Sequence, residues 1–125
     1  MRYFREIEPD IYAAAGALRT KADGRDWIGE YDTLLARGQP FAVIVDARDR
    51  PQPPAGKPMV LWMKARKAEL GRLVRLTAYV VEDGAERAEL ERALPARSKS
   101  SPYPMAVAAS PADALTKARS SLGRT

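Results

Sequence analysis

FAVIVDAR, residues 41–48, is the only run in this sequence that is apolar on both faces of a strand and then turns polar. In an extended backbone the odd positions from Phe41 to Val45 point to one side. The even positions, Ala42 and Ile44, point to the other side. Apolar side chains on both faces are typical of a central strand in a helix-covered, mostly parallel sheet. The run therefore predicts an α/β domain.

Polar residues follow this strand at once, namely Asp46 and Arg48, with Asp49 directly after them. In open α/β sheets, ligands bind beyond the carboxyl ends of the strands. The three residues are therefore candidates for a binding site. An aspartate at this place can also serve only to cap a turn, and the sequence leaves both interpretations open.

Composition narrows the chemistry that the protein can perform. The 125 residues suffice for one domain, 1–125, with a substantial core, and they include no cysteine and no histidine. Disulfides, thiolate ligands and histidine-based catalysis are therefore excluded. No apolar run reaches the roughly 20 residues of a membrane span, and residues 1–6 lack the apolar core of a signal peptide. We expect a cytoplasmic protein without a cofactor.

Most of the net charge of +5 lies in a basic segment from Lys57 to Arg75, which has six basic residues and one acidic residue. Charge alone supports only non-specific binding of nucleic acid. The basic residues do not form one stripe, and no nucleic-acid-binding motif is present. We interpret the segment as a solvated face.

Periodicity and turn signals predict five strands and four helices. The strands are expected at 3–7, 11–18, 41–46, 76–81 and 105–109. The helices are expected at 23–37, 58–72, 83–94 and 111–122, with Asp23 or Asp26 capping the first, Pro95 ending the third and Ser110 capping the fourth. Residues 49–57 and 96–101 are expected to be loops. The alanine run in 11–18 leaves a helix open as an alternative, but a hairpin with 3–7 is favoured by the short turn at Pro9.

The helix expected at 58–72 supplies further candidate site residues. Trp62 lies beside a stripe of methionines, and such adaptable apolar groups suit a lipid or a small apolar ligand. Arg66 falls in the same stripe, where it can meet an anionic head group or reach solvent. The alternative is that the stripe is simply core.

The start of that helix is a second candidate. Gly56 and Lys57 precede it, and a helix N-terminus attracts phosphate or carboxylate groups. Pro58 removes one of the N–H donors that such a site needs.

Several stretches together resemble a known family. They are the hairpin, the Tyr-Asp-x-Leu-Leu run at 31–35, the strand at 41–48, and the ending at 103–107 followed by 110–115. This pattern is similar to the STAS-like fold and to small bacterial SpoIIAA-like proteins, which are also grouped with the CRAL-TRIO lipid-binding class. The resemblance implies one STAS-like α/β domain, with a mixed, mostly parallel sheet, an N-terminal hairpin and four helices.

The resemblance also implies a non-enzymatic regulatory or interaction module. Phosphoregulated members carry a serine in an Asp-Ser-x-Gly stretch, but here that place holds residues 53–58, where only Gly56 matches. No serine or threonine lies between Thr33 and Thr77, so we do not expect the phosphorylation switch.

We therefore expect an interaction module whose surface is the loop 46–57. The alternative is binding of a lipid or a small apolar anionic ligand, or peripheral membrane association through the basic helix. A magnesium-dependent enzyme using Asp46, Asp49 and Glu82 has no specific spacing to support it. A homodimer through the exposed hairpin edge is a further expectation.

Overall fold

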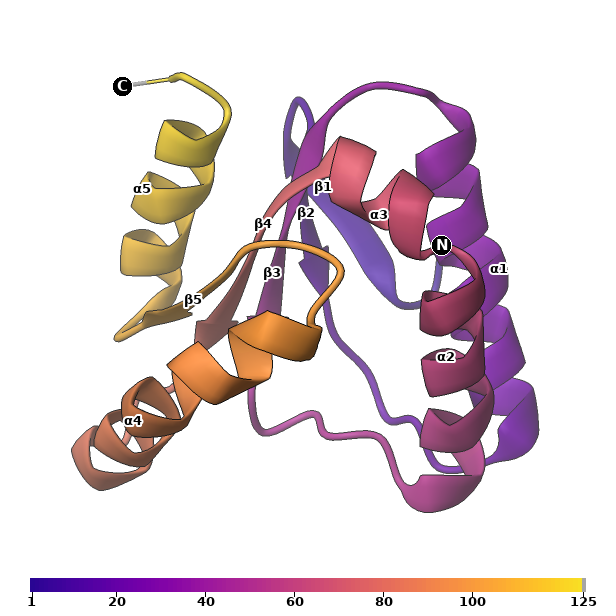
Figure 1. The fold of residues 1–125 in the computed structure, drawn as a ribbon, viewed down its shortest axis with the longest axis horizontal. Coiled ribbons are helices and arrows are strands. Elements are labelled where there is room, and N and C mark those ends of the chain that lie inside the picture. Colours follow the sequence, from indigo (N-terminus) through magenta and orange to yellow (C-terminus); the bar gives the residue numbers. More distant parts are fainter. Residues whose placement is uncertain (125) are drawn as a thin grey trace.

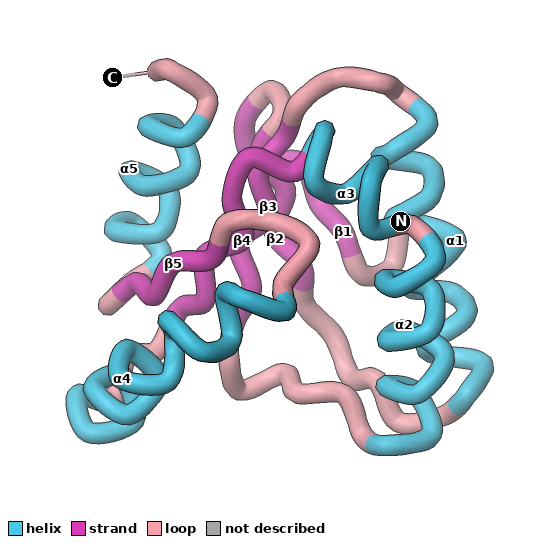
Figure 2. The backbone as a smooth tube through the Cα atoms, viewed as in Figure 1, coloured by secondary structure: helices cyan, strands magenta, loops and turns pink. Residues whose placement is uncertain are grey.

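The computed structural model describes residues 1–124, which form a five-stranded sheet with helices on both faces (Figures 1 and 2). The strand order is β1-β2-β3-β4-β5; β1 runs antiparallel to β2, and the other neighbours are parallel. The strands are β1 (Phe4–Glu8), β2 (Ile11–Ala14), β3 (Phe41–Asp46), β4 (Val74–Val80) and β5 (Met105–Ala108). The helices are α1 (Lys21–Ala36), α2 (Pro53–Ala65), α3 (Lys67–Leu73), α4 (Gly84–Ser100) and α5 (Pro111–Ser121). The predicted α/β class is confirmed.

The run at 41–48 supplies the central strand, as predicted. β3 lies between β2 and β4, and its side chains divide between two apolar clusters. Phe41 and Val43 belong to the cluster under α1, α2 and α3, whereas Ala42 and Ile44 belong to the cluster under α5. The alternation along one strand therefore decides which helices cover which face.

The two faces are covered unequally. In Figure 1, α1, α2 and α3 stand together on one side of the sheet and α5 stands alone on the other. α4 lies at the β5 edge and has no buried residue. The face under α1, α2 and α3 has the larger apolar core. α4 contributes no buried residue to either core.

Residues 3–14 form the predicted hairpin, and the helical alternative for the alanine run is wrong. The second strand ends at Ala14 instead of Leu18. Asp10 has a positive φ of 66° in the turn, a conformation that aspartate tolerates better than most residues. β1 lies at the edge of the sheet, as the predicted dimer through the hairpin edge requires. The dimer itself stays a prediction.

The predicted count of four helices is wrong, because the segment expected as one helix at 58–72 contains a break. α2 ends at Ala65 and α3 begins at Lys67, with Arg66 between them at φ −107° and ψ 18°. At this break the chain turns toward β4. Periodicity did not reveal it, since the methionines of α2 and the leucines of α3 pack into the same core.

Prolines caused two further errors in helix boundaries. α2 begins at Pro53, inside the expected loop 49–57, and it contains Pro58. α4 runs past Pro95 to Ser100, so the expected loop at 96–101 is mostly helical. A proline inside a helix leaves the carbonyl four residues earlier without its donor. Here those carbonyls belong to the exposed residues Pro54 and Glu91, where water can satisfy them.

Helix caps explain where α1 and α5 start. Thr20 caps α1 in a reciprocal pair with Asp23, so the cap lies three residues before the predicted aspartate. Ser110 caps α5 as predicted, with Pro111 at the first position and Asp113 bonded back to the cap.

Candidate functional site: a tyrosine-lined pocket

An apolar pocket of about 230 Å³ lies between the sheet and the helices α1 and α2. Its inner part is formed by aromatic and aliphatic side chains and one threonine, and its outer rim by residues of the β2–α1 and β3–α2 loops and of α2. The inner residues include Phe4, Trp27, Tyr31, Thr77 and Tyr103; the rim includes Gly16, Asp49, Pro51 and Val60. We call this the tyrosine pocket, because four of the five tyrosines of the sequence line it.

Two hydroxyl groups in the tyrosine pocket lack partners. The side chains of Tyr31 and Thr77 are 2% and 3% exposed, and neither Tyr31 Oη nor Thr77 Oγ1 forms a hydrogen bond within residues 1–124. Buried polar groups in native proteins are nearly always hydrogen-bonded. Two unpartnered hydroxyls on residues that line one cavity therefore offer hydrogen-bonding groups to a polar atom of a ligand.

The phenols of the pocket are neutral at any physiological pH. Burial raises the pKa of Tyr31 far above its ordinary value, and burial likewise raises the pKa of Tyr79 and Tyr103. The neighbouring phenols of Tyr79 and Tyr31 add to the rise at Tyr103, since like charges would repel. Each phenol can therefore donate one hydrogen bond and accept others.

Helix α1 is held in place behind the pocket by an aromatic and ionic cluster. The Trp62 ring lies 5.0 Å from the ring of Tyr31, and Trp62 Nε1 donates to Asp32 Oδ1 at 3.0 Å. Arg66 Nη1 donates to the same oxygen at 2.6 Å, and its Nη2 pairs with Glu69 Oε2. Trp62 and Arg66, both predicted as ligand-binding residues, thus support the wall of the pocket from outside.

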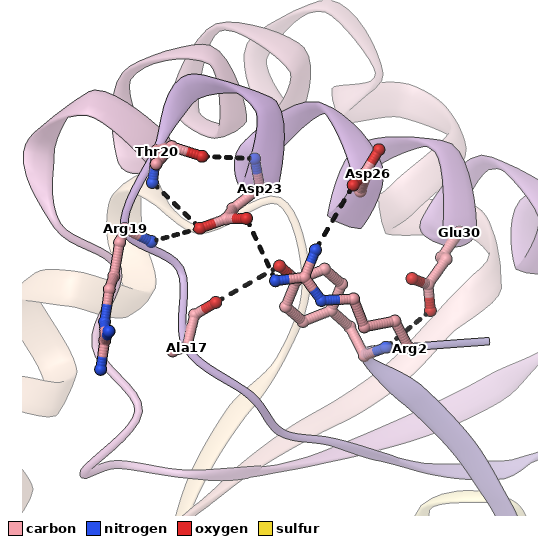
Figure 3. A network of polar contacts seen from close by, with 8 residues as sticks. Arg2, Ala17, Arg19, Thr20, Asp23, Asp26 and Glu30 are labelled. Atoms are coloured by element: carbon pink, nitrogen blue, oxygen red, sulfur yellow. Dashed lines mark hydrogen bonds and ion pairs between the residues drawn. The ribbon is translucent and has the colours of Figure 1, made fainter.

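The N-terminal wall is fixed by a second polar network, drawn in Figure 3. Asp23 accepts from the backbone N–H groups of Arg19 and Thr20 and pairs with Arg2 at 3.1 Å. These hydrogen bonds lower the pKa of Asp23 to about 2. Glu30 accepts from the backbone at the start of β1. The network ties the start of β1 and the β2–α1 loop, which form one wall of the pocket, to α1.

A close helix crossing sets the position of α2 over the pocket. Gly24 on α1 lies so near Ala55 on α2 that a Cβ at position 24 would stand 2.5 Å from the Ala55 carbonyl oxygen. Only glycine allows this approach. The first turns of α2, with Gly56 and Met59, therefore lie directly on the pocket.

The candidate residues that the sequence placed together after β3 do not all line the tyrosine pocket. Asp49 and Gly56 line the tyrosine pocket. Asp46 and Arg48 bind each other, with Arg48 Nη2 2.7 Å from Asp46 Oδ2 and the Arg48 N–H donating to Asp46 Oδ1. The capping interpretation of Asp46 thus has direct support. Lys57 is exposed on α2.

A second, more polar cleft of about 330 Å³ adjoins the tyrosine pocket. The two cavities share Val45, Asp49, Pro51 and Tyr79 as walls, and the far side of the cleft is formed by α4. Within residues 1–124, no group of three or more acidic side chains is placed to hold a metal ion. Asp46, Asp49 and Glu82 accordingly do not form the magnesium site considered above.

Most aromatic residues of the pocket were not predicted as site residues. Tyr31 was assigned only to the apolar face of a helix, and Tyr3, Tyr79 and Tyr103 lie in three other segments. The one signal in the sequence is composition, which has five tyrosines and only two phenylalanines, and four of those tyrosines line the pocket.

Comparison of the chain with protein-family models, with curated proteins and with solved structures finds no match. None of the helices in residues 1–124 combines the length and the apolar character needed to cross a membrane.

Proposed function

We propose that this protein binds a small, largely apolar molecule that carries one hydrogen-bonding group, with the tyrosine pocket as its binding site. The observation that carries the proposal is the pair of unpartnered, buried hydroxyls, Tyr31 Oη and Thr77 Oγ1, on two residues that line an otherwise apolar cavity. A buried hydroxyl without a partner costs free energy, and a ligand oxygen or nitrogen would recover it. Aromatic walls would supply the remaining binding energy through burial of apolar surface.

The volume limits the ligand. Pockets for drug-sized molecules hold about 300–1,000 Å³, so a pocket of about 230 Å³ suits a ring system or a short chain. A whole phospholipid would not fit inside it. Of the ligands expected from the sequence, the small apolar molecule has the strongest support.

The regulatory role implied by the STAS-like resemblance remains a prediction. Ligand binding supports it in one respect, because a pocket that borders both the β3–α2 loop and α2 would transmit ligand occupancy to the exposed surface 46–57. The proposal for the pocket does not depend on that role, nor on the STAS-like family.

Isothermal titration calorimetry with 2-naphthol tests the proposal, since this probe is apolar, small and carries one hydroxyl. Wild-type protein should bind it with measurable heat. Gly56→Leu should abolish binding, because a Cβ at Gly56 meets only Pro51 at 3.7 Å on the rim and the added side chain would obstruct the entrance.

Gly29→Leu is the matched control. Gly29 also lies in a helix, but it is exposed and nothing lies within 4 Å of a Cβ built there. This variant should bind 2-naphthol like the wild type. Equal binding by Gly56→Leu and Gly29→Leu, or no binding by the wild type, would contradict the proposal.

A further inference from the structure

The cleft beside the tyrosine pocket contains two guanidinium groups without ion pairs. Arg50 and Arg97 both line it, and neither forms a salt bridge within the described residues. The carboxylate of Asp46 in the same cleft is already neutralised by Arg48. Asp49 is therefore the one carboxylate there that lacks an ion pair. Within this cleft two unpaired guanidinium groups face one unpaired carboxylate, and the four carboxylates of Glu82, Asp83, Glu86 and Glu89 line a larger cleft that the same arginines border.

The cleft opens directly beside the apolar site. Val45 and Tyr79 stand between the two cavities and line both. Burial raises the pKa of Tyr79, and the positive charge of Arg97 partly offsets that rise. Arg97 is therefore close enough to Tyr79 to influence it electrostatically. A molecule that extends past Tyr79 would move from an apolar environment into one with free guanidinium groups.

We infer that the ligand is an amphiphilic organic anion, with its apolar body and its hydrogen-bonding group in the tyrosine pocket and a carboxylate or similar group on Arg97 and Arg50 in the adjoining cleft. This inference rests on the proposed function of the tyrosine pocket. Guanidinium groups match the planar geometry of a carboxylate and hold it by two parallel hydrogen bonds.

The anionic site lies away from the arginine that the sequence suggested. Arg66 was the predicted partner of an anionic head group, but Asp32 and Glu69 already occupy its donors. Arg97 comes from the C-terminal part of α4, which the sequence predicted as a loop. Helical structure past Pro95 is what brings this side chain to the cleft.

Three probes of nearly equal shape separate charge from apolar fit: 4-phenylbutanoate, 4-phenyl-1-butanol and 4-phenylbutylamine. In calorimetric titrations at pH 7.4 and low salt, the anion should bind about tenfold more tightly than the alcohol, and the amine should bind most weakly. Added salt should reduce the advantage of the anion and leave the alcohol unaffected.

Substitutions then locate the anionic group. Arg97→Gln should reduce the affinity for 4-phenylbutanoate to that for the alcohol, and the double variant with Arg50→Gln should leave no preference for the anion. Binding of the alcohol should change less than twofold. Arg92→Gln, on the exposed side of the same helix and outside every cavity described here, is the control and should change nothing.

Two failures are distinguishable. If the alcohol or the amine binds as tightly as the anion, or if Arg97→Gln weakens all three probes equally, the inference is overturned while the pocket stands. If none of the three probes binds the wild type, the inference and the proposed function of the pocket are both overturned.

Discussion

At the scale of single residues, the buried hydroxyl of Tyr31 forms no hydrogen bond within residues 1–124. Its ring packs against Trp27, Trp62 and Phe4 at centroid distances of 5.1, 5.0 and 5.2 Å, which phenylalanine would reproduce. The hydroxyl adds the cost of desolvation without a hydrogen bond in return. A buried hydroxyl that costs stability, on a residue that lines a cavity, is better explained by binding than by folding.

Tyr31→Phe should therefore weaken binding of 2-naphthol about threefold to tenfold and leave binding of naphthalene unchanged, as expected for loss of one hydrogen bond. Tyr12→Phe is the control. Tyr12 also has an unpartnered buried hydroxyl but does not line the pocket. It should bind both probes like the wild type and should unfold in urea with about 1 kcal/mol more stability. Equal effects of the two variants on 2-naphthol binding would argue against a hydrogen bond from Tyr31.

At the scale of elements, the position of α2 over the pocket depends on its crossing with α1. That crossing is close at Gly24 and Ala55, and the helices are also joined by the hydrogen bond from Trp62 to Asp32. The sequence identified α1 from its periodicity, but the role of Gly24 could not be predicted. A glycine within a helical pattern suggests only lower helix propensity, and its packing role depends on a partner 31 residues away.

Gly24→Ala should destabilise the protein by about 1–3 kcal/mol, because the new methyl group would displace the backbone of α2. The same substitution at Gly29 should stabilise it by up to about 1 kcal/mol, since alanine is the better helix former at an exposed position. Urea unfolding of both variants measures the difference. A neutral Gly24→Ala would show that the two helices can separate freely.

The sequence predicted elements best where the pattern was local. The alternation in β3, the hairpin and the Ser110 cap each depend on a few neighbouring residues, and all three are confirmed. The break at Arg66 and the helix past Pro95 depend on tertiary contacts and on solvent. Asp49 and Gly56, which were predicted as site residues from their places after β3 and before the expected helix, line the pocket, whereas the tyrosines converge only in three dimensions.

At the scale of the whole molecule, several ion pairs join segments that are distant in sequence. Arg119 on α5 binds Glu8 at the end of β1 with an Nε–Oε1 distance of 3.0 Å, and Arg2 joins the N-terminus to α1. Hydrogen bonds to arginine, lysine or backbone N–H groups lower the pKa of Glu8, Asp23, Asp46 and Asp113.

These lowered pKa values predict that the protein loses stability in acid. A carboxyl with a lower pKa in the folded state binds fewer protons than in the unfolded state, so its contribution is complete above the ordinary pKa and disappears as the pH falls through the folded value. For Asp23 that interval runs from about 4 down to about 2. Melting temperatures measured across this range should fall steeply in the wild type and less steeply in Asp23→Asn. An identical slope would show that the Asp23 network does not contribute.

The single helix on the second face of the sheet has a consequence for synthesis on the ribosome. Ile11, Ala42 and Ile44 depend on α5 for cover, with Ala114 and Ala118 closing over them. The chain emerges from its N-terminus, so every strand and the whole α1–α3 layer precede α5. Until residues 111–121 leave the ribosomal tunnel, a nearly complete sheet presents an uncovered apolar face to the cell. The risk of aggregation is therefore greatest after the five strands have emerged and before α5 follows them.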